Sequence, residues 1–524
     1  DGSVNFADLT VMLADWGTCP APCPSDIDGS GVVEFGDLLA LLTVFGDTCV
    51  GGEPTAMPLA ARPLPAYPFA SFDRTFLETD TDAGRLVAAI DPAVAPAAIG
   101  VLVDLYVVES RTAEQWAADG SLVDVRGAAQ PTTFGGPGLA EAIVPVEGWL
   151  PGDVGLDFGI AYDLVVDVDR DGVLGGGDLI DGLDGPGFHV VGDTTAPGPL
   201  EVQTTIYSSG QSFGAHIVRF PAEGGPYPLV VISHGNGHSY TWYQWLQTHL
   251  ASYGYVVTSH QNETQPGIET ASLSTLVNTD YTVGNRDTLA NGALAGKIDP
   301  TRIIWIGHSR GGEGVVRAYD RIRDGVFTPQ SFSLEDIRLV SSIAPTDFLG
   351  TGPASPEQAV YHLIYGAADG DVSGDPSCAV CQSFSLLERA SGRRYSTYVH
   401  AADHNDFNCC GFQDYCGDDN CPPQLGRDNV QQLTRGVYLA LLESVIRGRP
   451  QAEDFLFRPW EDLRPIGAPE STIVHEFQPD AGDPASGAFV IDDFQTAASL
   501  GQSSSGGAVS GTVSVRSEGR LDDN

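Results

Sequence analysis

The sequence predicts an α/β protein with a doubly wound sheet, preceded by a small all-α module and a β-sandwich-like domain. From residue 199 to residue 450, short strand-like runs alternate with helical ones, which is typical of a mostly parallel sheet covered by helices. Between residues 73 and 198 the strand-like runs alternate with turns instead, as in a small antiparallel sandwich. Residues 1–49 contain two copies of a short helical unit.

Composition narrows the possible functions before any motif is considered. The 524 residues include 69 Asp and Glu but only 26 Lys and Arg, so the formal net charge is −43. Such a field repels phosphate backbones and anionic lipid headgroups, which excludes nucleic-acid binding and disfavours a membrane surface. No apolar run approaches the roughly 18 residues of a membrane span, so we expect no such span.

The N-terminal module is a repeat within residues 1–49. Each copy has an acidic stretch with glycine, then an apolar helical stretch, and then Thr-Cys. Two helices of about eight residues cannot bury a core alone, so we expect the copies to pack on each other. Asp1 falls in the middle of the first acidic stretch and no signal peptide precedes it, so we expect a clipped start.

The remaining segments follow from local composition. Residues 50–72 are rich in Pro and Ala and predict a stiff linker, whereas residues 451–524 predict a partial β-like region or a tail. The strands expected in the sandwich-like domain are Gly100–Val108, Ala142–Val146, Ile160–Val168 and Gly187–Val191. Those expected in the α/β domain are Leu229–Ser233, Gly254–Thr258, Arg302–Ile306, Leu339–Ile343, Val360–Tyr365 and Tyr395–Val399. The expected helices are 241–252, 286–296, 311–323, 383–390 and 428–447.

The strongest chemical signal is a Gly-x-Ser-x-Gly motif between a buried strand and a helix. Arg302–Ile306 leads directly into Gly307, Ser309 and Gly311, and a helical pattern follows. A serine nucleophile at a sharp strand-to-helix turn needs small neighbours, and the two glycines provide them. The helix N-terminus behind it favours developing negative charge. We therefore predict that Ser309 is a nucleophile.

A serine hydroxyl needs a neighbouring base, which in this chain order follows the acid. His404 lies just beyond the strand Tyr395–Val399 and is the preferred base, with His400 as the runner-up. His362 sits inside a strand and His475 in the C-terminal region, so both are less suitable.

The acid that orients the base is expected on a loop after a neighbouring strand. Asp369 follows Val360–Tyr365 and is preferred. Asp371 lies two residues further on and stays open as an alternative. Asp347, after the preceding strand, is a third option.

A tetrahedral oxyanion needs two preorganised N–H donors. One is expected from the backbone of Arg310, directly after the nucleophile. The other is expected from the small-residue loop after Leu229–Ser233, with Asn236 preferred and Gly237 second. The residues predicted to line a substrate cleft are Trp242, Tyr243 and His308, although packing is an equally good explanation for some of the aromatic residues after this loop.

These motifs resemble those of an α/β-hydrolase over residues 200–450. His234-Gly235 on the oxyanion loop, Gly307–Gly312 at the elbow and His404–Asn408 at the base are similar to the branch of cutinase-like polyester hydrolases, chlorophyllases and platelet-activating-factor acetylhydrolases. Arg310 departs from the Met that bacterial polyester hydrolases usually carry and looks more chlorophyllase-like.

The resemblance implies a secreted, extracellular serine carboxylic ester hydrolase that acts through an acyl-enzyme, with no cofactor for catalysis. Its substrate is expected to be an ester, including polymeric esters. One alternative is a carbohydrate esterase that removes acetyl or feruloyl groups within a polysaccharide-degrading assembly. A second alternative is a binding or scaffold protein with an inactive hydrolase fold.

Three acidic segments have the ligand spacing of calcium loops. The first copy of the repeat keeps only the later ligand positions, Asp1, Asn5 and Asp8. The second copy offers Asp26, Asp28, Ser30, Glu34 and Asp37, and a third loop offers Asp167, Asp169, Asp171 and Asp178. Asp at the last position resembles a dockerin, which implies structural calcium and a cohesin partner for residues 1–49.

The nine cysteines are expected to form disulfides rather than a zinc site, because calcium loops and a secreted-type hydrolase point outside the cell. Three are N-terminal, and six follow the predicted acid and base: Cys378, Cys381, Cys409, Cys410, Cys416 and Cys421. Because the neighbours Cys409 and Cys410 would be strained if they paired with each other, we expect at least one of them to bond elsewhere. A bridge from Cys378 or Cys381 to Cys409 or Cys410 would clamp the acid and base loops together. Local 378–381 and 416–421 bridges are the alternative.

Overall fold

The computed structural model describes residues 85–90, 95–135, 140–145, 155–181, 183, 186–375, 377–413, 424–457 and 473–478, with short pieces within 9–73 and 501–508. Most of the N-terminal repeat and of the C-terminal region lies outside these residues. In the repeat, β1 (Gly17–Thr18) pairs antiparallel with β2 (Val32–Val33), which joins the first copy to the second.

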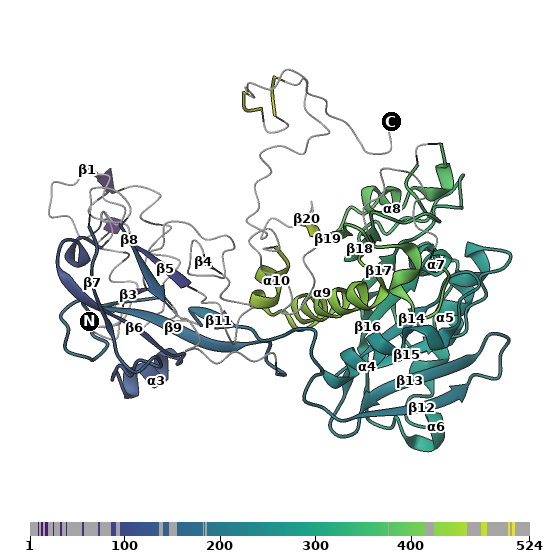
Figure 1. Ribbon diagram of the computed structural model, residues 1–524, viewed down its shortest axis with the longest axis horizontal. Helices are drawn as coiled ribbons and strands as arrows, with labels where there is room; N and C mark the ends of the chain where they lie inside the picture. The colour runs from purple at the N-terminus through teal and green to yellow at the C-terminus, as the bar shows by residue number, and fades with distance from the viewer. Residues whose placement is uncertain are drawn as a thin grey trace.

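The α/β region is built on one mixed sheet that has nine strands within the described residues (Figure 1). Their order is β12-β13-β15-β14-β16-β17-β18-β19-β20. The six strands from β15 to β19 run parallel, and β12, β13 and β20 are antiparallel to their neighbours. The strands are β12 Val202–Ser208, β13 Ala215–Pro221, β14 Tyr227–Ser233, β15 Val256–His260, β16 Ile298–His308, β17 Ile337–Ile343, β18 Tyr361–Gly366, β19 Arg394–Val399 and β20 Ile473–Gln478. The predicted doubly wound sheet agrees with this topology, and all six expected strands are present.

The sheet extends beyond the boundary at residue 450 that we predicted for this domain. α10 (Pro450–Phe457) packs on α9 (Arg427–Arg447), and β20 adds to the edge at β19. Phe477 contributes to this edge, with its ring 5.2 Å from that of Tyr395. A polar, Gly-rich context hid this strand from the sequence prediction.

The helices around the sheet agree with the prediction in four places. They are α4 Gln244–Ser252 after the 3-10 helix η2 Tyr240–Tyr243, α7 Arg310–Arg323, α8 Phe384–Glu388 and α9. The expected helix over 286–296 is wrong: only the turn α6 (Leu289–Gly292) forms, because Ala290 and Asn291 have φ of 50° and 60°, in the left-handed region. None of the helices in the described part of the chain is long and apolar enough to span a bilayer.

One long helix, α5 (Ile268–Gly284), was not predicted because its buried face is rich in Ser and Thr. Thr275, Thr279 and Thr282 each donate a hydroxyl proton to a carbonyl four residues earlier, at 2.7–3.1 Å. These internal bonds satisfy the hydroxyls, so polar side chains pack where apolar periodicity is normally the signal. α5 packs against α7, the helix that follows the predicted nucleophile.

The region between residues 50 and 198 is β-rich, and its described strands form two sheets (left of Figure 1). One contains β3 Thr55–Ala56, β10 Leu179–Ile180, β9 Ile160–Asp167, β6 Leu102–Glu109, β7 Gln130–Thr133 and β11 Phe188–Val190. The other contains β4 Phe72–Asp73, β5 Arg85–Ile90 and β8 Ala140–Pro145. α3 (Ala113–Ala118) lies beside the first sheet. β3 falls in the segment predicted as a linker, and the sandwich arrangement stays a prediction.

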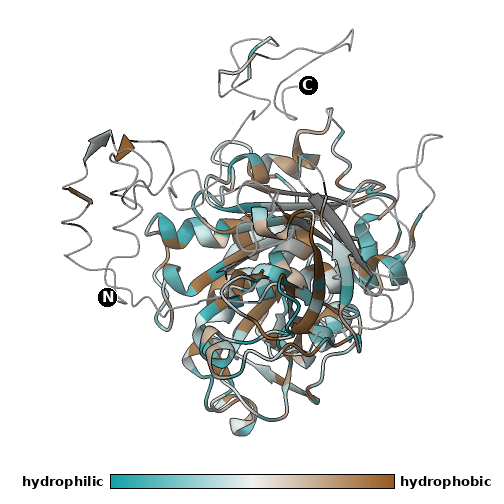
Figure 2. Ribbon diagram, turned by 90° about the vertical axis from the view of Figure 1, so that its left-hand side faces the viewer, coloured by the Kyte–Doolittle hydropathy of each residue, from teal (hydrophilic) through white to brown (hydrophobic). Residues whose placement is uncertain are grey.

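The hydrophobic core is continuous across the described parts of both regions. In Figure 2 hydrophobic colouring is concentrated on interior strands, in line with the fully buried stretches of β14 and β16. Phe158 of the β-rich region meets Phe455 of α10 edge to face, with ring centres 6.1 Å apart. The core therefore joins the two regions. Within the α/β sheet, the parallel strands place their carboxyl ends, and the loops that follow them, at one edge.

Candidate active site

The predicted nucleophile lies at a strained junction between β16 and α7. Ser309 has φ 56° and ψ −125°, a conformation that a non-glycine residue adopts only when its surroundings require it. A Cβ on Gly307 would lie 2.1 Å from the Gly311 carbonyl oxygen, and one on Gly311 would lie 2.3 Å from the Ser233 oxygen. Both flanking positions therefore accept only glycine, which is the steric requirement of a nucleophile elbow.

The preferred base and acid are in direct contact. His404 lies on η5 (His404–Phe407) after β19, and its Nδ1 is 2.7 Å from Oδ2 of Asp369, which follows β18. Both side chains are buried. The other carboxylate oxygen accepts backbone N–H bonds from Asp371 at 2.9 Å and Val372 at 2.7 Å. The carboxylate is thus fixed in place and orients the imidazole.

The alternative acids occupy different environments. Asp347 is paired with Arg389, with the closest nitrogen and oxygen 2.7 Å apart, so its charge is already matched. Asp371 has a side chain that is 55% exposed, and its Oδ2 lies 3.5 Å from the Nε2 of His404. Asp371 therefore contacts the base from the solvent side, whereas Asp369 contacts it from within.

The alternative bases occupy different environments. His400, the runner-up, is exposed at the end of β19. His362 lies inside β18, where its ring nitrogens are 2.8 Å from the Ser341 hydroxyl and 3.0 Å from the Thr397 hydroxyl. Those contacts make His362 a satisfied core histidine.

The predicted oxyanion loop lies against the nucleophile. A Cβ on Gly235 would come within 2.8 Å of both the Ser309 Cβ and the His238 ring, so the backbone there approaches the elbow closely. The Asn236 side-chain oxygen accepts a bond from the Gln265 amide at 2.5 Å, which ties this loop to the one after β15. Gly237 follows with φ 70°. Of the two predicted donor positions, residue 236 follows β14 and residue 310 directly follows Ser309 at the end of β16, the neighbouring strand in the sheet.

Two of the three residues predicted to line the substrate cleft are fully buried. Tyr243 and His308 are both 0% exposed, and the Tyr243 hydroxyl is 3.0 Å from Nδ1 of His308. The same hydroxyl is 3.1 Å from Nδ1 of His238, which sequence reasoning did not select as a site residue. These buried side chains are linked to the base, because the His308 ring lies 4.9 Å from that of His404. Trp242 is partly exposed.

Burial keeps the supporting histidines neutral. It lowers the pKa of His238 to about 3, with a smaller effect from the neighbouring His404, and lowers the pKa of His308 well below its usual value. Of the three neighbouring imidazoles of His238, His308 and His404, only that of His404 is paired with a buried carboxylate.

Glu313 is a second residue that the sequence reasoning missed. It lies one turn after Ser309 in α7, is fully buried, and accepts bonds from the Thr346 hydroxyl at 2.7 Å and the Phe348 N–H at 2.8 Å. Burial raises its pKa to about 7, against the opposing effect of these bonds. Glu313 thus anchors the loop after β17 to α7. The sequence feature that could have pointed to it is an acidic residue in the first helical turn after the Gly-x-Ser-x-Gly motif.

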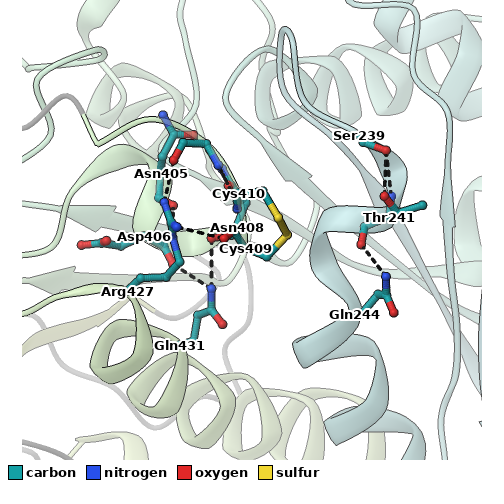
Figure 3. Close-up of a disulfide and its surroundings, with 11 residues drawn as sticks. Ser239, Thr241, Gln244, Asn405, Asp406, Asn408, Cys409, Cys410, Arg427 and Gln431 are labelled. Atoms are coloured by element: carbon teal, nitrogen blue, oxygen red, sulfur yellow. Dashed lines mark hydrogen bonds between the residues drawn. A yellow bond between two sulfur atoms is a disulfide. The ribbon is translucent and has the colours of Figure 1, made fainter.

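The disulfides contradict the predicted clamp between the acid and base loops. Cys378 pairs with Cys381, and Cys409 pairs with its sequence neighbour Cys410 (Figure 3). The two pairs are local, so no bridge within the described residues crosses from one loop to the other. Cys416 and Cys421 lie outside the described residues.

Hydrogen bonds hold the base loop to other parts of the domain. The Cys409 N–H donates to the Trp242 carbonyl at 3.1 Å and ties the base loop to η2. Arg427 supports the same loop from α9 by donating to the carbonyls of Asn405, Cys409 and Gly411 (Figure 3). The base loop is therefore held mainly by bonds to its backbone.

Three of the four carboxylates predicted in the third acidic loop lie close together. Oxygen atoms of Asp167, Asp169 and Asp171 lie within 4.8 Å of one another. The Gly172 N–H, at the turn position, donates to Asp167 at 2.9 Å. Asp178 accepts bonds from two backbone N–H groups of the loop, and burial together with Asp167 and Asp169 raises its pKa. The five ligands predicted in the second repeat lie outside the described residues.

Comparison with known proteins points to one kind of enzyme. A family model described as PET hydrolase-like matches residues 185–329, which include the elbow and the oxyanion loop but end before Asp369 and His404. Cutinase 2 of Thermobifida cellulosilytica is 30% identical over 125 residues, which is 23% of this chain and 45% of that protein. Cutinase cut1 of Thermobifida fusca is also 30% identical over 125 residues, 37% of its length. The chain thus spans less than half the length of these relatives, and the matches support a cutinase-like hydrolase domain.

Proposed function

We propose that this protein is a secreted serine carboxylic ester hydrolase of the cutinase-like kind, acting through an acyl-enzyme. The observation that carries the proposal is the buried contact between His404 and Asp369 at the same sheet edge as Ser309. The matches to a PET hydrolase-like family and to cutinases support it independently.

In the proposed reaction, the Ser309 hydroxyl attacks the ester carbonyl while His404 takes its proton. Asp369 holds the imidazole in the tautomer that presents Nε2 and stabilises the imidazolium that forms. Backbone N–H groups of Asn236 and Arg310 stabilise the oxyanion. His404 then protonates the leaving alcohol, and water attacks the acyl-enzyme by the same steps in reverse.

A fluorophosphonate probe and a 4-nitrophenyl ester test the mechanism together. We expect wild-type protein to gain one probe mass on Ser309, and Ser309→Ala to lose labelling and nearly all hydrolysis. His404→Ala should reduce kcat by at least about 10⁴-fold, because members of such a unit fail together. His400→Ala is the matched control and should change kcat little; a larger loss in His400→Ala would move the base to residue 400.

A proposal for the natural ester is supported by the relatives rather than by the triad. Because the relatives are cutinases and the family model is PET hydrolase-like, we propose a polymeric ester ahead of an acetyl or feruloyl carbohydrate ester. An intact set of Ser, His and Asp argues against an inactive scaffold. A panel of polyester films and acetylated or feruloylated polysaccharides, with release of acid as the readout, separates these substrates.

We also propose that calcium binds the loop of residues 167–178 in a structural role. Support comes from the gathered oxygens of Asp167, Asp169 and Asp171, since hard oxygen ligands at this spacing suit Ca²⁺. EDTA should lower the melting temperature without abolishing turnover, and Asp169→Asn should remove that effect of EDTA. Immediate and complete loss of activity on chelation would contradict both the structural role and the metal-free serine mechanism.

The role of residues 1–49 stays a prediction. Their acidic repeats are similar to a dockerin, and a cohesin module is the partner that this similarity implies. Binding of residues 1–49 to a cohesin panel in the presence of calcium tests it.

A further inference from the structure

The Arg310 side chain is the part of the site that the proposed reaction leaves without a role. Its Nη1 donates to the Thr264 carbonyl, in the loop after β15, at 3.1 Å. On its other side the guanidinium carbon lies 5.1 Å from the centre of the Phe348 ring, in the loop after β17. Phe348 is 39% exposed. A cation is thus held between two loops at the carboxyl edge of the sheet, directly after the nucleophile.

No carboxylate pairs with this cation within the part of the chain that the structure describes, although the chain carries 69 acidic residues. The nearest comparison is Arg389, whose guanidinium lies 2.7 Å from Asp347. A guanidinium has five N–H donors, and Arg310 uses one of them on Thr264. The charge and the remaining N–H donors of Arg310 are therefore available for a group that the described residues do not supply.

The position of Arg310 indicates which part of an ester would meet it. The leaving oxygen has to face His404, because that residue returns the proton, and His404 follows β19. In the strand order β19 and β15 lie on opposite sides of β16, which carries Ser309. The acyl group extends away from the leaving oxygen, and so toward the β15 loop to which Arg310 is bound.

We propose that Arg310 selects esters whose acyl group carries a second, free carboxylate, namely half-esters of dicarboxylic acids. The planar fork of a guanidinium matches a carboxylate with two parallel hydrogen bonds, and the Phe348 ring keeps the plane in place. This inference rests on the proposed ester hydrolysis and adds the chemistry of the acyl group to it. A chain end of a polyester with a free acid has this chemistry.

The test compares mono-4-nitrophenyl glutarate with its methyl-capped ester in the full-length protein. The readout is the ratio of the two kcat/KM values, in which any general effect of a substitution on the elbow cancels. We expect Arg310→Gln to lower this ratio about tenfold or more, mainly through KM, because a charge-assisted bond is lost. Arg310→Lys should keep part of the preference, and added salt should reduce it in the wild type.

The matched control is Arg338→Gln. Arg338 also donates to a backbone carbonyl, that of Thr301 at 3.0 Å, but it lies at the opposite end of β17. This variant should keep the wild-type ratio. A ratio that is equal in wild type and Arg310→Gln overturns the inference, whereas failure of the wild type to cleave either ester overturns the proposed function instead.

Discussion

Two aspartates follow neighbouring parallel strands of the sheet, yet their surroundings give them opposite roles. Asp347, after β17, is paired with Arg389 at 2.7 Å, and the same loop is held from α7 by Glu313. Asp369, after β18, is paired with no arginine among the described residues; its partners are backbone N–H groups and the His404 imidazole. A carboxylate whose charge is matched by a guanidinium stabilises a loop, whereas one facing an imidazole can stabilise a developing imidazolium.

Substitution of both aspartates is the strongest test of this comparison. Asp369→Asn should reduce kcat for 4-nitrophenyl butyrate by about 10⁴-fold, because the amide no longer holds the productive tautomer. Asp347→Asn should change kcat by less than about tenfold but lower the free energy of unfolding by about 1–3 kcal/mol, since Arg389 loses its partner.

Urea unfolding monitored by fluorescence, together with steady-state kinetics, separates these outcomes. Asp371→Asn serves as the control for loss of a carboxylate near the base, because its side chain is exposed. A larger loss of kcat in Asp347→Asn than in Asp369→Asn would exchange the two roles.

The elements that the sequence predicts well are those with dense local signals. The six parallel strands are short apolar runs, and the elbow combines a strand, two glycines and a helix, so the fold at Ser309 follows from adjacent residues. The pairing of Asp369 with His404 could be expected from chain order, because parallel strands end at one edge.

The features that escaped prediction depend on contacts between distant residues. α5 buries hydroxyls that bond within the helix, and β20 joins the sheet from 74 residues beyond its partner's end by pairing with β19. Tyr243 and His308 were expected to line a cleft, but both are fully buried. The hydrogen bond between them satisfies the Tyr243 hydroxyl and Nδ1 of His308 and so favours this burial. The Cys378–Cys381 pair was the local alternative to the predicted clamp, whereas the Cys409–Cys410 pair was not expected, because it depends on a loop conformation that spacing alone does not determine.

Titration of Glu313, which holds the loop after β17, should have a smaller effect than the aspartate substitutions, and this effect is on the pH dependence of stability. The pKa of this buried carboxyl is raised from 4.5 to about 7, mainly by burial, so the folded state binds more protons than the unfolded state between these values. Its contribution to stability is therefore fully present below pH 4.5 and is lost as the pH rises through 7. The shift corresponds to at most about 3 kcal/mol.

Glu313→Gln removes the titration but leaves an amide facing the N–H groups of Phe348 and Leu349, so the variant should be less stable at pH 5. Because only the wild type loses stability as Glu313 ionises, the difference between the two should shrink by about 1–3 kcal/mol between pH 5 and pH 8. Urea unfolding at several pH values measures that difference, with Glu335→Gln, an exposed position, as the matched control. A difference that stays constant over this range would show that Glu313 keeps one protonation state, and the loop after β17 would then be anchored independently of pH.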